Sequence, residues 1–90
     1  RAGIDLRQSQ WRTDARFLAI DLAEQVRAYG PSGLPTARRS AWRDRVAERL
    51  PGGEATVEWP VTAGDSGTIT LVWRPPGNAG DAELRYVFLS

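Results

Sequence analysis

The 90-residue sequence contains no histidine, cysteine, methionine or lysine. Without histidine it lacks the commonest general base and the commonest neutral metal ligand. Without cysteine it has no thiol nucleophile, no thiolate metal site and no disulfide. Its five serines lie on a predicted helix, in loops, at a helix cap or at the terminus, with no lysine to act as a base. We therefore expect a protein that is not an enzyme and that binds no cofactor and no metal.

Long hydrophobic runs are also missing. No segment approaches the roughly 18 consecutive apolar residues of a membrane-spanning helix, and the glycine-rich segments match neither a P-loop nor a dinucleotide-binding fingerprint. With 41% hydrophobic and 26% charged residues, the composition is that of one globular domain over residues 1–90.

Residues 1–29 are predicted to form one long amphipathic helix. Apolar residues recur three, four or seven positions apart, which marks a helical stripe: Ile4, Trp11, Ala15, Leu18, Leu22, Val26 and Tyr29. Four more are expected to widen this stripe in the second half: Phe17, Ala19, Ile20 and Ala23. Gly30 and Pro31 end the helix. No capping residue precedes Ile4, so we expect the helix to continue upstream of Arg1.

Residues 30–53 are predicted to be a connector that contains a short helix over residues 40–50. Ser40 is the expected N-cap, and Trp42, Val46 and Leu50 are spaced to face the core.

Residues 54–90 change to a period of two, which is typical of half-buried strands. The alternation covers residues 54–61, 68–74 and 83–88, and the short connectors favour an antiparallel meander. Pro60 has no backbone N–H to donate to a neighbouring strand, so the first strand is predicted to lie at an edge of the sheet. The sequence therefore predicts an α+β fold, in which the long N-terminal helix packs on a three-stranded antiparallel sheet and a short second helix closes one end.

Arginines form the strongest local charge feature, around the second helix: Arg38, Arg39, Arg43, Arg45 and Arg49. The simpler interpretation is a solvated helix face. A basic interaction patch that contacts nucleic acid phosphates is the alternative, although no exposed aromatic residues are interleaved with these arginines.

Several segments together resemble one protein family. They are LAEQVRAYG at the end of the first helix, the Trp-led segment WRDRVAERLPGG, the strand TITLVWR and the terminal strand LRYVFLS. In this order they resemble the type IV pilin-like proteins, and the PilV-type minor pilins in particular. The resemblance covers residues 12–90, and it departs from many pilins in lacking their cysteine pair.

The resemblance implies a minor pilin, a structural subunit that helps to initiate or cap a type IV pilus used in motility, adhesion or DNA uptake. An upstream apolar half-helix would anchor it in the inner membrane, with this domain in the periplasm, before assembly into an extracellular pilus. Its partners would be other pilin subunits, contacted through the N-terminal helix. Arg7, Trp11 and Asp14 are the candidate contacts, because Trp11 lies where the helix is expected to project from the sheet. The isolated domain is expected to be monomeric.

Two alternatives remain open. A minor pseudopilin of the type II secretion system, of the I subtype, shares this layout and differs in its partners. A nucleic-acid-binding domain that uses the arginine-rich helix belongs to another class.

Overall fold

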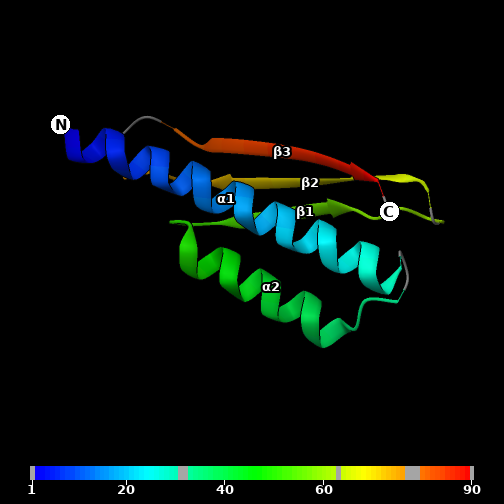
Figure 1. Ribbon diagram of the computed structural model, residues 1–90. Helices are drawn as coiled ribbons and strands as arrows, with labels where there is room; N and C mark the ends of the chain where they lie inside the picture. The colour runs from blue at the N-terminus through cyan, green and yellow to red at the C-terminus, as the bar shows by residue number, and fades with distance from the viewer. Residues whose placement is uncertain (1, 31–32, 63, 77–79, 90) are drawn as a thin grey trace.

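The computed structural model describes residues 2–30, 33–62, 64–76 and 80–89, and of residues 2–8 the backbone alone. It contains two helices and three strands (Figure 1): α1 (Ala2–Tyr29), α2 (Thr36–Arg49), β1 (Glu54–Glu58), β2 (Ser66–Trp73) and β3 (Ala82–Leu89). The three strands form one antiparallel sheet. The predicted α+β class is therefore confirmed.

The sheet is a meander in the order β1-β2-β3. Thr56 faces Thr70 across the first pair of strands, and Ile69 faces Tyr86 across the second. The prediction that the first strand is an edge is confirmed, but β1 ends at Glu58, so Pro60 follows the strand instead of lying in it. Val61, predicted to alternate inward, is 83% exposed beyond the strand end. β3 is the other edge.

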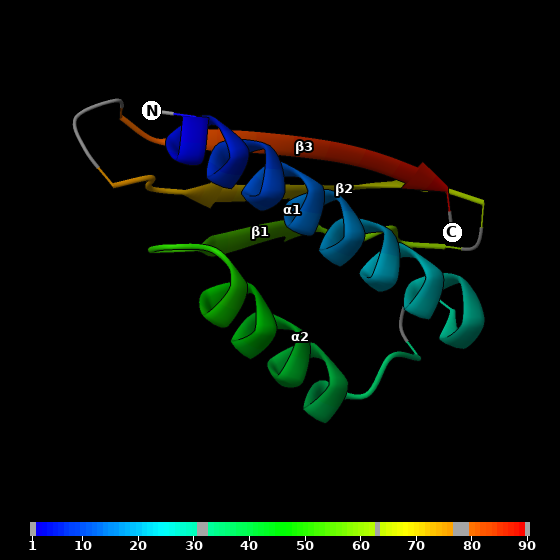
Figure 2. The ribbon, with the colours of Figure 1, turned by 60° about the vertical axis from the view of Figure 1, so that its left-hand side comes forward.

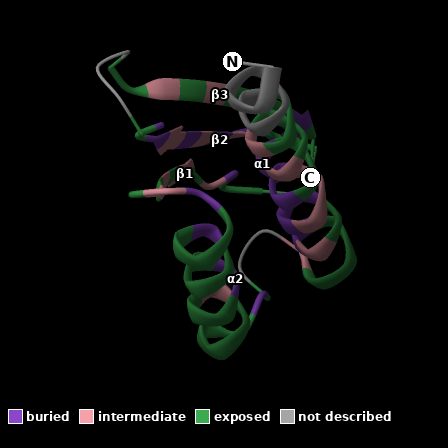
Figure 3. Cartoon of the chain, turned by 90° about the vertical axis from the view of Figure 1, so that its left-hand side faces the viewer, coloured by how far each residue is buried: buried purple, intermediate pink, exposed green. Residues whose placement is uncertain are grey.

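The core lies between the sheet and the two helices. α1 packs on β3 and β2, while α2 packs on α1 and β1, so that α1 runs along the sheet and α2 lies beside it (Figure 2). Buried residues gather where these elements meet, and the outer sides of both helices are largely exposed (Figure 3). The core residues are Ala15, Leu18, Ala19, Leu22, Ala23, Val26, Leu34, Trp42, Val46, Leu50, Ile69, Leu71, Trp73 and Phe88.

Both helix ends near the connector follow from local chemistry. Gly30 has a φ of 87° and donates its N–H to the Val26 carbonyl at 2.7 Å, which is the expected left-handed end of α1. α2 begins at Thr36 and not after Ser40, so the predicted N-cap was wrong. Pro35 occupies the N-cap position. Its fixed φ suits the start of a helix, and the residues after it continue the helix into the predicted segment.

Candidate subunit-contact surface

The residues predicted to contact other subunits lie on the N-terminal half of α1. Arg7 belongs to this helix, but its side chain lies outside the described residues. Trp11, which the sequence placed in the apolar stripe where α1 was expected to project, is half-buried and packs against the core. Asp14 is half-buried as well.

Arg12 explains why this part of α1 does not project from the sheet. Its guanidinium lies 5.6 Å from the centre of the Trp73 ring and donates to the Glu83 carbonyl at 3.5 Å. These contacts join α1 to the ends of β2 and β3, next to Trp11, which packs against the core. Trp11 therefore does not offer a fully exposed aromatic ring to a partner.

The exposed apolar surface of α1 lies one to two turns further along, at Phe17 and Ile20. Phe17 is 66% exposed and Ile20 is half-buried, although both were predicted to widen the core stripe. At about 100° per residue, Phe17 lies about 140° round the helix from Leu22. The prediction was therefore wrong for Phe17. A helical wheel would have shown that Phe17 lies outside the buried stripe.

Phe17 and Ile20 belong to a longer seam of α1 with alternating spacings of four and three residues. We call this the outer seam: Thr13, Phe17, Ile20, Glu24 and Arg27. Such spacing brings side chains onto one helix face and is the pattern by which helices pack against other helices. The outer seam has two apolar residues at its centre and charged residues at its C-terminal end, and its residues Ile20, Glu24 and Arg27 border the hollow between α1 and β3.

The predicted arginine patch is divided by the buried stripe of α2. Arg38 and Arg45 lie on the side that faces α1, where Arg38 stacks 5.2 Å from the Tyr29 ring centre. Arg39 and Arg43 lie on the side that faces β1. Arg39 stacks 4.4 Å from the Trp59 ring centre, and Arg43 donates to the Ala55 carbonyl at 2.8 Å.

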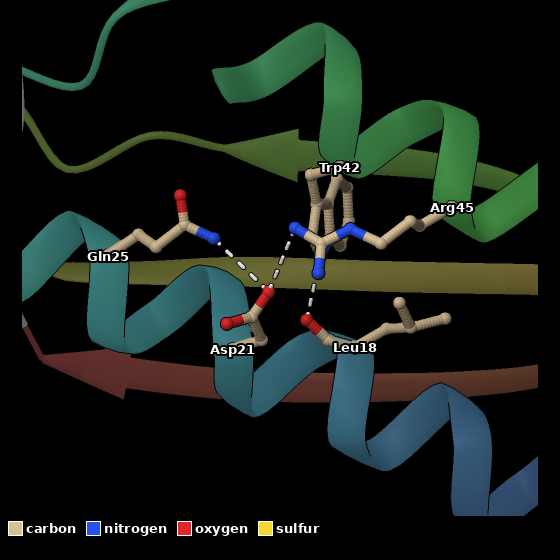
Figure 4. A network of polar contacts seen from close by, with 5 residues as sticks. All are labelled: Leu18, Asp21, Gln25, Trp42 and Arg45. Atoms are coloured by element: carbon tan, nitrogen blue, oxygen red, sulfur yellow. Dashed lines mark hydrogen bonds and ion pairs between the residues drawn. The ribbon is translucent and has the colours of Figure 1, made fainter.

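Arg45 takes part in a polar network between the two helices (Figure 4). It lies 3.4 Å from the Asp21 carboxylate, which also accepts a hydrogen bond of 3.1 Å from Gln25. Beside them, the Trp42 indole N–H donates to the Leu18 carbonyl at 2.8 Å. These contacts fix α2 on α1. Arg45 is therefore held by a contact within the chain, whereas an arginine of a continuous binding patch would be free to contact phosphates.

We predict that this cluster of arginines binds DNA only weakly, because four of the five arginines contact other parts of the chain. Arg49 is exposed. We expect the Arg49→Ala variant and the unaltered chain to show the same weak DNA affinity at low ionic strength. A binding curve that weakens steeply with salt, and weakens further on Arg49→Ala, would restore the patch interpretation. Fluorescence anisotropy with a DNA duplex at several salt concentrations makes this measurement.

Within the described ranges, no three acidic residues gather closely enough to hold a metal ion. Neither helix, over its described residues, combines the length and hydrophobicity that crossing a membrane requires. No protein-family model, curated protein or solved structure matches this chain.

Proposed function

We propose that this chain is the membrane-free domain of a minor pilin, a structural and assembly subunit of a type IV pilus. The shape of the molecule supports this. Its extents are 45 × 22 × 17 Å, and α1, with 28 residues, is about 42 Å long at about 1.5 Å per residue. The helix therefore sets the long axis of the domain, with the sheet and α2 on one side of it.

The outer seam of α1 is the observation that carries the proposal. A subunit that joins a filament through its long helix needs apolar side chains on a helix face that its own sheet leaves uncovered. Among the described side chains of α1, Phe17 is the most exposed large apolar one at 66%, and Ile20 lies one turn away on the same face. Helix packing against neighbouring subunits would bury both residues.

We also propose a cellular location and partners for the domain. An upstream apolar segment would anchor the subunit in the inner membrane with the domain in the periplasm, and assembly would carry it into the extracellular filament. The contacts made there would be with other minor and major pilins. The outer seam replaces Trp11 as the proposed centre of these contacts, while Arg7 and Asp14 stay as candidates beside it.

Phe17→Ser tests this function in the organism that encodes the chain. We expect the yield of sheared surface filaments to fall at least about tenfold, because an aromatic hot spot at a protein contact contributes about 2 kcal/mol or more, and about 1.4 kcal/mol corresponds to tenfold. Val61→Ser is the control, since Val61 is also an exposed apolar residue, 83% exposed, and follows β1 instead of lying on α1. Both variants should retain the circular dichroism of the unaltered domain. Normal filament yield with Phe17→Ser would contradict the proposal.

A further inference from the structure

Two arginines on the flank of α2 that faces β1 have no acidic partner. α2 packs beside β1 (Figure 2), and Arg39 and Arg43 lie one turn apart on this flank. Arg39 stacks on the Trp59 ring, and Arg43 donates to the Ala55 carbonyl. No ion pair of the described residues includes either arginine. Two like charges one turn apart repel each other, and no ion pair offsets them here.

The guanidinium of Arg39 is held in place but donates no hydrogen bond to the described residues. Its central carbon lies 4.4 Å from the Trp59 ring centre. Nε is its one nitrogen that is buried without a hydrogen-bond partner, so the two terminal nitrogens reach the surface. Stacking uses the flat face of a guanidinium and leaves the donors at its edge available. A positioned cation with two free donors suits a carboxylate, which accepts two parallel hydrogen bonds.

The spacing of the two arginines selects an extended acidic peptide as the occupant. Four residues of a helix span about 6 Å, and alternate residues of an extended chain are about 6.7 Å apart. Two acidic side chains separated by one residue therefore reach both arginines together. Nucleic acid is a poorer match, because it binds through many phosphate contacts, while Arg38 and Arg45 lie on the other side of α2.

Acidic residues nearby confine this site to the flank of α2. Asp44 follows Trp42 by two residues and therefore lies about 200° round the helix from the buried side. Glu54 lines the hollow of about 300 Å³ beside Arg43. Both carboxylates repel an acidic segment, so such a segment runs from Arg43 towards Arg39 and away from Glu54.

We propose that this flank binds an acidic segment of a partner protein, in which two carboxylates separated by one residue pair with Arg39 and Arg43. One carboxylate accepts hydrogen bonds from the terminal nitrogens of Arg39, which stacking on Trp59 leaves free. The other pairs with Arg43, whose remaining donors are not used by the Ala55 carbonyl. This site is separate from the outer seam of α1 and does not rest on the proposed function.

A five-residue peptide in which threonine alternates with two glutamates, with blocked ends, is the probe. We expect it to shift the side-chain Nε–H NMR signals of Arg39 and Arg43 in the labelled 90-residue chain, and to leave those of Arg38 and Arg49 unchanged. The same peptide with glutamine in place of glutamate should shift none of them. Equal shifts at all four arginines, or no shift at any, would overturn the proposal.

Arg39→Gln and Arg38→Gln are a matched pair of variants. Each removes one positive charge and one guanidinium that stacks on an aromatic ring. We expect Arg39→Gln to weaken peptide binding about tenfold, because a hydrogen bond to a charged group contributes about 1.5–3 kcal/mol. Arg38→Gln should leave the affinity nearly unchanged, and both variants should keep the circular dichroism of the unaltered chain. Equal weakening would mean attraction by net charge alone and would contradict a defined site.

Two further ligands test the spacing and the chemistry of the occupant. A peptide with two adjacent glutamates directs them to opposite sides of an extended chain, and we expect it to bind about tenfold more weakly. Equal binding by the two peptides would overturn the proposed geometry. A short single-stranded DNA that binds this flank more tightly than the acidic peptide would overturn the choice of occupant. These measurements use the isolated chain, so their outcome is independent of filament assembly.

Discussion

Replacing Trp42 by alanine should lower the free energy of unfolding by about 3–5 kcal/mol. The Trp42 side chain is 1% exposed and fills the space between α2, α1 and the sheet. Its indole N–H also donates to the Leu18 carbonyl. For a chain of this length the total stability is about 5–13 kcal/mol, so the variant should lose a large part of its resistance to urea.

Two further variants show which property of Trp42 matters. Trp42→Phe keeps an aromatic ring but removes the donor, and we expect a smaller loss of about 1–3 kcal/mol. Val61→Ala is the exposed control and should change the free energy of unfolding by less than about 0.5 kcal/mol. Denaturant titration followed by circular dichroism measures all three. A Trp42→Ala loss no larger than that of Val61→Ala would show that the indole is not part of the core.

The sheet was predictable because its signal is local. Ile69, Leu71 and Trp73 alternate with polar residues, and they are 0%, 0% and 2% exposed. Turn residues in the short connectors before and after the second strand favoured pairing between consecutive strands, which gives a meander. The end of the first strand was less predictable, because apolar alternation continues to Val61 while Pro60 interrupts the donors that a longer strand would need.

The start of α2 was misplaced because two signals competed. Ser40 is a good N-cap residue, but Pro35 is followed by Thr36 and by residues that favour a helix. Serine is tolerated inside a helix at a small cost. The longer helix places Arg38 beside Tyr29 and Arg39 beside Trp59, and these are contacts that a helix beginning at Ser40 would not make.

The candidate surface could be predicted only in part. A list of apolar residues places Phe17 with its neighbours in the stripe, whereas the helix turns it away from Leu22. The hollow between α1 and β3 has no sequence signal, because it joins residues near position 24 to residues near position 87 across the fold. Arginines that are neighbours in sequence were separated by the same helical geometry, since Arg39 and Arg45 lie on opposite sides of the buried stripe of α2.

Leu22→Ala should lower the free energy of unfolding by about 2–5 kcal/mol. Leu22 is 0% exposed and lies at the centre of the buried face of α1, where truncation leaves a cavity that neighbouring side chains fill only partly. Glu24→Ala is the matched control two residues along the same helix. Glu24 is exposed, and alanine is a better helix former, so we expect a change of less than about 0.5 kcal/mol.

The pair of variants tests the orientation of α1 directly. If α1 faces the sheet through Leu22, urea titration should give a lower midpoint for Leu22→Ala with an unchanged slope, because the surface exposed on unfolding stays nearly the same. Equal losses in the two variants would mean that the buried face of α1 is wrongly assigned. The outer seam would then be wrongly assigned too, because Phe17 and Glu24 are outward only if Leu22 is inward.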